Sequence, residues 1–381
     1  MLFGKLLTAF ATTLLATVSA VPVEVETSQI GKRDFGPVTI FTPPSTYVNE
    51  RTLYARSLLL KDGSILTTWE NYDWSGMPWF PIFKSTDHGF TWTNFSQAHD
   101  TQNGWGLRYQ PFLHLLENDI GGFKAGTILL AGNSIPADLS KTQLELYAST
   151  DNGASWGFVS HIANGGKAVP NNGETPVWEP FLLEYKGQVI CYYSDQRDPA
   201  HGQKLVYQST SDLKNWGKVV DVEANAVYSA RPGMPIISKM SNNQYFLTYE
   251  NGGAAEVDFA VYYKIVSNPL SFGKIQGQAL RTVDGHVPYG SPYNIWTPVG
   301  PLQQGTVVVN ANSDSDCFIN HNYGTGNWTR LTTQAYADYS RSLAVGLNPK
   351  DIVIVSGGAL GMGPTNHVYM AARDVNGCST C

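Results

Sequence analysis

The 381-residue sequence contains few cysteines, few charged residues and no long stretch with helical periodicity. Its four cysteines cannot cross-link a chain of this length extensively, so a hydrophobic core must supply the stability. Only 15% of the residues are charged, the net charge is −6, and no basic run occurs, which argues against a nucleic-acid partner. Phosphate-binding loops, nucleophile elbows and metal-ligand spacings are also missing, so we expect neither a metal nor another cofactor.

The longest apolar run in the sequence lies near its N-terminus. Lys5 precedes a mostly apolar stretch at 6–17, and Val18-Ser19-Ala20 fits a small-residue cleavage site. The run is too short for a membrane anchor, which favours a secreted protein. The pair Lys32-Arg33 fits the end of a pro-peptide, and a solvated charge pair explains it equally well. The expected organisation is a signal peptide at 1–20, a pro-peptide at 21–33 and a single domain at 34–381.

Aromatic residues and turn formers are abundant. Aromatics make up 12% of the sequence, which also has 37 glycines and 21 prolines, a composition typical of all-β proteins. The stretches 85–92 and 149–156 share the pattern Ser-x-Asp-x-Gly-x-(Ser/Thr)-Trp. The aspartate can accept hydrogen bonds from its own turn, the glycine supplies a positive φ, and the tryptophan anchors the returning strand. Both stretches therefore predict tight turns between strands.

A pair of apolar strands recurs six times along the chain. The first strands are expected near 54–60, 109–115, 178–183, 231–237, 295–299 and 339–345, and the second near 64–70, 126–132, 188–194, 245–250, 306–310 and 351–356. Aromatic turn residues follow at intervals of roughly 60 residues. This period predicts a six-bladed β-propeller, because a β-sandwich would explain the short strands but not the repeat. The last copy lacks a strand, which residues 37–41 can supply to close the ring.

Propeller geometry identifies the residues at one mouth of the central channel. The first strand of each blade begins at that mouth, and the second strand returns to it. The mouth positions are Arg56, Tyr109, Glu179, Arg231, Tyr339 and Arg341 on first strands, and Trp69, Glu70, Asp195, Tyr249, Glu250 and Asn310 on second strands. Charges are scarce in this chain, yet they gather at these apolar strand ends, where a buried charge needs a partner or a function.

Two of the mouth carboxylates are candidates for acid–base chemistry. Glu179 lies between Trp178 and Pro180, in apolar company that would raise its pKa, and Glu250 closes a strand of the next blade. Carboxylates of neighbouring blades can face each other across a sugar, as glycoside cleavage requires. Glu174 is held in reserve, and Glu70, Asp195 and Asp73 are further candidates. The competing interpretation is that these carboxylates form structural ion pairs with Arg56, Arg231 or Arg341.

These motifs resemble a known family. The two aspartate turns and Tyr54-Ala55-Arg56-Ser57 resemble the sialidase superfamily of six-bladed propellers. The stretches 177–181, 249–253 and 339–341 make the sequence more similar to secreted fungal exo-arabinanases of glycoside hydrolase family 93. The resemblance implies retaining exo-cleavage of linear α-1,5-L-arabinan, a side chain of pectin, by a monomer that releases arabinobiose. It also implies a glutamate pair, carried by position onto Glu179 and Glu250.

The apolar surroundings of Glu179 favour it as acid/base and Glu250 as nucleophile, and the reverse is possible. The expected substrate-binding residues are Arg56, Trp69, Tyr109, Trp178, Asp195, Arg231, Tyr249, Tyr339 and Arg341. Two alternatives stay open. A sialidase would use Arg56, Arg231 and Arg341 around a carboxylate sugar, with Tyr339 and Asp73 in catalysis. A non-catalytic sugar-binding propeller would have no pair of mouth carboxylates facing a common point.

Overall fold

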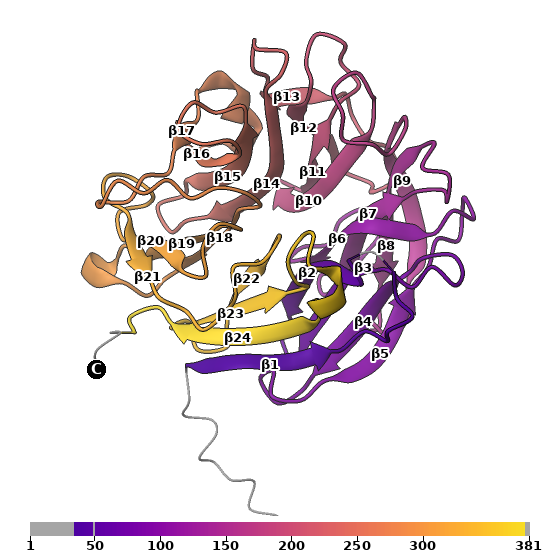
Figure 1. The fold of residues 1–381 in the computed structure, drawn as a ribbon, viewed down its shortest axis with the longest axis horizontal. Helices are drawn as coiled ribbons and strands as arrows, with labels where there is room; N and C mark the ends of the chain where they lie inside the picture. Colours follow the sequence, from indigo (N-terminus) through magenta and orange to yellow (C-terminus); the bar gives the residue numbers. More distant parts are fainter. Residues whose placement is uncertain (1–33, 49, 378–381) are drawn as a thin grey trace, which may run out of the picture. The chain divides into compact units, whose positions relative to one another are not determined.

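Six four-stranded antiparallel sheets form a ring in the computed structural model, which describes residues 34–48 and 50–377 (Figure 1). The expected signal and pro-peptide segments lie outside the described residues. Blade I consists of β2 (Thr52–Leu59), β3 (Ile65–Asn71), β4 (Phe80–Ser85) and β5 (Thr93–Ala98), and blade II of β6 (Leu107–Leu115), β7 (Ile128–Ser134), β8 (Thr142–Ser149) and β9 (Gly157–Gly165). The first strand of each blade lies nearest the centre of the ring (Figure 1).

The next three blades repeat this order. Blade III consists of β10 (Val177–Tyr185), β11 (Gln188–Asp195), β12 (Lys204–Thr210) and β13 (Val220–Glu223), and blade IV of β14 (Arg231–Lys239), β15 (Tyr245–Gly252), β16 (Ala260–Val266) and β17 (Gln278–Ala279). Blade V consists of β18 (Tyr293–Thr297), β19 (Thr306–Asn310), β20 (Cys317–Asn320) and β21 (Thr329–Leu331). The predicted strand pairs are confirmed in all of these blades.

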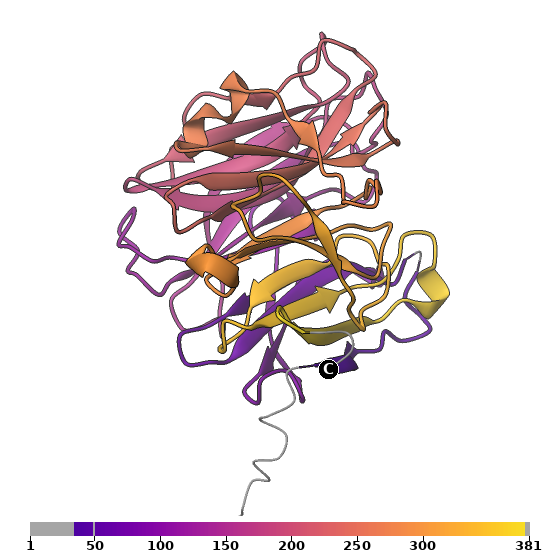
Figure 2. The ribbon, with the colours of Figure 1, turned by 90° about the vertical axis from the view of Figure 1, so that its left-hand side faces the viewer.

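Blade VI joins the two ends of the domain. It contains β22 (Ser342–Val345), β23 (Asp351–Ser356), β24 (Val368–Asp374) and, as its outermost strand, β1 (Phe35–Phe41). β1 pairs antiparallel with β24, so the yellow and indigo strands lie side by side in Figure 1 and meet again in the side view of Figure 2. The ion pair between Arg373 and Asp34, at 2.6 Å, fastens the same junction. The six-bladed propeller and its closure by the N-terminal strand are therefore confirmed.

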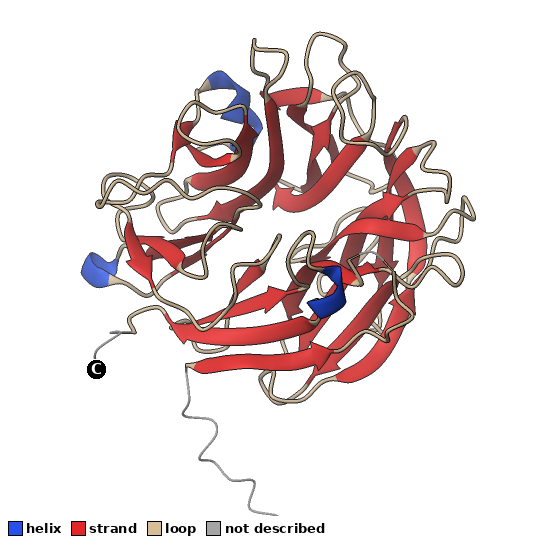
Figure 3. Ribbon diagram, in the orientation of Figure 1, coloured by secondary structure: helices blue, strands red, loops and turns tan. Residues whose placement is uncertain are grey.

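Helical structure is limited to three short 3-10 helices in the described residues (Figure 3). They are η1 (Pro269–Lys274), η2 (Pro301–Gln303) and η3 (Gly363–Thr365). None of the helices in the described part of the chain is long and apolar enough to cross a membrane.

The aspartate turns join third to fourth strands, as their sequence predicts. Asp87 accepts hydrogen bonds from the backbone N–H and hydroxyl of Thr91, and Gly89 has a φ of 94°. Asp151 makes the matching contacts in blade II with Ser155. The corresponding turn of blade III lacks the full motif, but Asp212 closes it by accepting the N–H groups of residues 214 and 215. An aspartate one position later in the turn thus replaces the motif aspartate, because the turn needs only a carboxylate that can accept its backbone N–H groups.

Candidate active site

Each blade carries one non-glycine residue with a positive φ in the first residues of its inner strand or just before it. These residues are Tyr54, Gln110, Glu179, Met234, Ser291 and Ser340, with φ values of 54°, 60°, 61°, 56°, 45° and 53°. In blades I to IV the ladder between the first two strands shifts register at this place, as in a β-bulge. A left-handed conformation is costly for residues other than glycine, and its recurrence at one position indicates a feature that the ring enforces.

Side chains of one blade accept the backbone N–H groups of these residues in the next blade. The N–H of Gln110 donates to Glu70 Oε1 (3.0 Å), and the N–H of Glu179 donates to Gln110 Oε1 (3.0 Å). The N–H of Met234 donates to Glu179 Oε2 (2.7 Å), and that of Ser291 donates to Glu250 Oε2 (2.7 Å). Donors that the bulges would leave unpaired are therefore satisfied, and the accepting carboxylates are held in one orientation.

Glu179 and Glu250 approach a common point beside Gly233. A Cβ placed on Gly233 would lie 3.3 Å from Glu179 Oε2 and 3.3 Å from Glu250 Oε1. The two oxygens are therefore no farther apart than the sum of these distances. Glycine at this position leaves the space between the carboxylates open. Ser194 of the second strand of blade III donates a further hydrogen bond of 2.6 Å to Glu179 Oε2.

The surroundings of the two glutamates raise the pKa values of both. Loss of water raises the pKa of Glu250 to about 8, with the neighbouring charge of Glu179 as the second cause. Burial also raises the pKa of Glu179, but the hydrogen bonds from Ser194 and Met234 work against that rise. Two adjacent carboxylates that are shielded from water cannot both ionise easily, so in the free protein they share a proton.

Arginines lie near the pair without forming ion pairs with it. Within residues 34–48 and 50–377, neither glutamate has an arginine at ion-pair distance, which contradicts the structural ion-pair interpretation. Arg231 lowers the pKa values of both glutamates electrostatically, while its guanidinium donates to Asn172, Gln196 and Gln203. The amides thus fix a positive charge beside the carboxylates without an arginine hydrogen bond to the carboxylate oxygens.

Arg56, Tyr339 and Tyr54 form another wall of the same site. The Arg56 guanidinium lies 3.9 Å from the centre of the Tyr54 ring and donates to the carbonyl and the hydroxyl of Ser340. The ring centres of Tyr54 and Tyr339 are 6.3 Å apart. Burial raises the pKa of Tyr339, and the charges of Glu179 and Glu250 raise it further.

Glu70 and Tyr109 lie next to this group. Glu70 is buried and accepts the Tyr72 hydroxyl (3.0 Å) together with the Gln110 N–H, and burial raises its pKa to about 7. Tyr109 contacts Tyr72, with ring centres 6.2 Å apart. The structure therefore brings Glu179, Glu250, Arg56, Arg231 and Tyr339 together, with Glu70 and Tyr109 at their edge.

Other expected site residues point elsewhere. Trp69 is fully buried between Phe41 and Phe83, so its ring is part of the interblade core. Tyr249 is 2% exposed, and its hydroxyl donates to Glu223 in blade III, away from Glu250. Side chains alternate between the two faces of a strand, so the residue before a channel-facing glutamate faces the opposite way. These two aromatics are not positioned to contact a sugar at the carboxylate pair.

Four more expected residues have structural partners. Arg341 is 1% exposed and donates only to the backbone carbonyls of residues 311, 314, 315 and 336. Asp195 is paired by both oxygens with Arg197. Trp178 is buried and donates to Gln196, which also accepts from Arg231, so it supports the site from behind. The reserve carboxylate Glu174 lies 3.8 Å from Lys167 on a loop.

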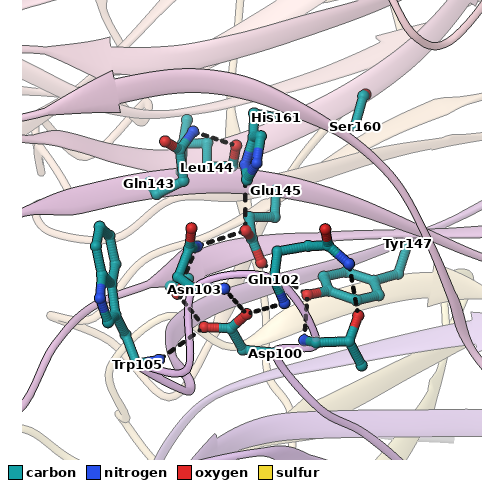
Figure 4. A network of polar contacts seen from close by, with 12 residues as sticks. Asp100, Gln102, Asn103, Trp105, Gln143, Leu144, Glu145, Tyr147, Ser160 and His161 are labelled. Atoms are coloured by element: carbon teal, nitrogen blue, oxygen red, sulfur yellow. Dashed lines mark hydrogen bonds and ion pairs between the residues drawn. The ribbon is translucent and has the colours of Figure 1, made fainter.

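A second buried carboxylate fixes the loop between blades I and II (Figure 4). Glu145 on β8 accepts from the Tyr147 hydroxyl and the Asn103 amide, both at 2.7 Å, and lies 3.2 Å from His161. Asp100 accepts the backbone N–H groups of residues 102, 103, 105 and 106. Burial raises the pKa of Glu145 to about 7. This network holds the loop but does not face the carboxylate pair.

Sequence reasoning missed Gln110, Gly233 and Ser194. A usable pattern was present: proline follows the positive-φ residue in blades II to V, at positions 111, 180, 235 and 292. Proline restricts the preceding residue, so four equivalent X-Pro pairs mark four equivalent backbone irregularities. Aligning the blades on these pairs would have placed Gln110 and Glu179 at one repeat position.

An α-L-arabinanase from Penicillium chrysogenum, solved with arabinobiose, superposes with a TM-score of 0.87 at 48% identity over 90% of this chain and 99% of that chain. The family 93 α-L-arabinofuranosidase of Fusarium graminearum, also solved with arabinobiose, gives 0.88 at 46% identity with the same coverage. The NanB sialidase of Streptococcus pneumoniae, at 9% identity and a TM-score of 0.58 over 90% of this chain and 71% of that chain, shares the fold alone.

No family model and no curated protein sequence matches the chain. The solved structures nevertheless show the family, because their sequences are 45–48% identical to this one over 90% of the chain. The chain belongs to glycoside hydrolase family 93.

Proposed function

We propose that this protein is a secreted exo-α-L-arabinanase that hydrolyses linear α-1,5-linked arabinan with retention and releases arabinobiose. The observation that carries the proposal is the approach of Glu179 and Glu250 to one point beside Gly233. Two solved relatives with at least 46% identity were determined with arabinobiose, which supports the choice of sugar. Glycoside cleavage needs a pair of carboxyl groups, and here the pair lies at a channel mouth that aromatic residues line.

The chemistry uses the two carboxyl groups in turn. The ionised one attacks the anomeric carbon while the protonated one gives its proton to the departing glycosidic oxygen, which forms a glycosyl ester and frees the rest of the chain. The second group, now a carboxylate, then removes a proton from water. That water attacks the anomeric carbon and releases the first carboxylate. Retention requires the two carboxyl groups to lie about 5–5.5 Å apart, and the shared contact with Gly233 is compatible with that spacing.

Fixed charges around the pair would favour the transition state. Arg231 keeps a positive charge near both carboxylates because three amide oxygens hold its guanidinium. The Tyr339 hydroxyl stays protonated because burial and the charges of both glutamates raise its pKa, so it can donate to a sugar oxygen. These groups are positioned before substrate arrives, so little reorganisation is needed.

The two alternative functions lack support in the site. A sialidase would need Arg341 to contact a carboxylate sugar, but its guanidinium is buried against four backbone carbonyls. A non-catalytic sugar-binding propeller would have no carboxylates facing a common point, whereas Glu179 and Glu250 both face Gly233. We therefore favour the arabinanase.

The proposal is tested by incubating the purified protein with debranched arabinan and, separately, with sialyl-lactose. We expect arabinobiose from arabinan and no release of sialic acid. Proton NMR of the first product shows its anomeric configuration, and an inverted product would refute the retaining mechanism. Sialic acid release, or no product from arabinan, would refute the proposed substrate.

Secretion and the monomeric state belong to the same proposal. They rest on the apolar N-terminal run, the small-residue site at 18–20 and the resemblance to secreted fungal enzymes that act on the arabinan of pectin. N-terminal sequencing of protein from the culture medium is expected to begin at Val21 or, after pro-peptide removal, at Asp34. Retention of the N-terminal 20 residues would contradict cleavage. Light scattering gives the mass in solution, and a dimer mass would contradict the monomer.

A further inference from the structure

A cavity of about 690 Å³ lies between blades III and IV, behind the strand that carries Glu250. Three segments line it: residues 221–226 at the end of β13, parts of β15 and β16, and residues 273–277 beside η1. The size falls in the range of small-molecule sites. None of the groups assigned to catalysis lines this cavity.

Strand β15 separates the cavity from the carboxylate pair. Glu250 accepts from Ser291 of blade V, whereas Tyr249 donates to Glu223 of blade III. Alternate side chains of a strand point to opposite faces, so Tyr249 and Asn251 share the cavity face while Glu250 faces the channel. The two sites therefore stand back to back on one strand.

A buried ion pair forms one wall of the cavity. Lys264 is 3% exposed and donates to the carbonyls of Val222 and Phe272 and to Glu223 Oε2, the last at 2.7 Å. The Tyr249 hydroxyl donates to the same Oε2. Glu223 Oε1 accepts no hydrogen bond from the described residues. Glu223 is thus held through its Oε2, and its Oε1 can accept a hydrogen bond from a ligand.

A second acceptor without a partner lies beside the first. Asn251 lines the cavity and is 9% exposed, and its side-chain Oδ1 has no hydrogen-bond partner among the described residues. This oxygen is closed off from solvent, so a ligand hydroxyl reaches it only after the Asn251 amide turns toward the cavity. The Tyr262 ring lines the same space and offers an apolar face.

Two glycines allow the third segment to close over this space. A Cβ on Gly277 would lie 2.0 Å from the Tyr249 hydroxyl, and one on Gly273 would lie 2.3 Å from the carbonyl oxygen of Asp221. Side chains at these positions would push the segment away from blade III and widen the cavity. The shape of the cavity therefore depends on residues without side chains at both contacts.

We infer that this cavity is an accessory carbohydrate site, which binds one end of an arabinan chain or a second chain. The open oxygen of Glu223 suits a hydroxyl donor, and the aromatic ring of Tyr262 suits the apolar side of a sugar ring. An anion would meet Glu223 and Asp221, and a cation would meet Lys264 and Lys274, so a neutral polyhydroxylated ligand fits best. The identity of the sugar rests on the proposed function.

The test uses the full chain with Glu179→Gln, so that arabinotriose binds without being hydrolysed. Isothermal titration is expected to show one binding event at the central site and one at the cavity. Adding Ala226→Trp, which places a large ring at the exposed rim of the cavity, should remove the second event. The matched control is Ala154→Trp, at an exposed alanine in the aspartate turn of blade II, and it should keep both.

Crystals of the Glu179→Gln protein soaked in arabinotriose locate each sugar. Sugar density against Asn251 and Glu223 is the expected result. A single event at the central site, or two events that survive Ala226→Trp, would overturn the accessory site and leave the proposed function standing. No binding at either site would instead count against the proposed function.

Discussion

The backbone N–H of Glu179 donates a hydrogen bond of 3.0 Å to the side-chain oxygen of Gln110, the residue at the same position in the preceding blade. The N–H of Gln110 donates in turn to Glu70, also over 3.0 Å. Three consecutive blades are thereby linked through one line of contacts that ends at a carboxylate of the site. Gln110 is a positioning residue: it holds the backbone of Glu179 and makes no hydrogen bond to its carboxylate.

Replacing this acceptor should impair catalysis more than substrate binding. Gln110→Met keeps the side-chain volume but leaves the Glu179 N–H without a partner, at a cost of about 1–3 kcal/mol. We expect kcat on arabinan to fall about tenfold or more with KM little changed, and the pH optimum to shift because the carboxylate moves. Gln143→Met, in the same blade but away from the pair, is the control. Equal kinetics for the two variants would contradict the positioning role.

The two glutamates should be separable by chemical rescue. Glu179→Gln and Glu250→Gln are each expected to lower kcat by about a thousandfold or more, since each removes a group that acts on the reacting atoms. Added azide should restore turnover of the acid/base variant and give a glycosyl azide of retained configuration, and an inverted azide identifies the nucleophile variant. Glu174→Gln, which loses only a loop contact with Lys167, is the matched control. Full activity in both site variants would refute the assignment.

Gly233 should tolerate no side chain, although its backbone does not require glycine. Its φ is not in the left-handed region, but a Cβ would lie 3.3 Å from an oxygen of each glutamate and 3.0 Å from the Gln203 amide nitrogen. We expect Gly233→Ala to reduce kcat/KM by about tenfold to a hundredfold while thermal unfolding changes little. Gly76→Ala, at an open loop position, serves as control because nothing lies within 4 Å of its added Cβ. Unaltered kinetics would show that the space between the carboxylates is unused.

The ring of blades could be predicted because short sequence patterns within each blade specify its strands and turns. The spacing of turn aromatics and the apolar strands gave the blades, and the ends of first and second strands gave the mouth. Both glutamates followed from that register. The aspartate of the third turn, Asp212, escaped notice because its carboxylate reaches the turn from a shifted position.

The repeat pattern in the sequence did not predict which way individual side chains point. Trp69 and Tyr249 each precede a glutamate that faces the mouth, so strand alternation turns both rings away from it. Arg341 was expected at the site because of its place before an inner strand, yet both of its terminal nitrogens donate to backbone carbonyls instead. The contacts of Gln110 depend on a positive φ that only the assembled blades enforce.

Stability should fall as the pH rises from about 4.5 to 8, because two buried carboxyls and one half-buried carboxyl hold their protons in the folded state. The pKa values of Glu70 and Glu145 are raised to about 7 and that of Glu250 to about 8, from an ordinary value of 4.5. Between these limits the folded chain binds more protons than the unfolded chain, so the free energy of unfolding decreases with pH. Urea unfolding at pH 5 and pH 8 is expected to show greater stability at pH 5. Glu145→Gln should flatten the curve up to pH 7, since its amide does not ionise. A stability that rises across this range would contradict the raised pKa values.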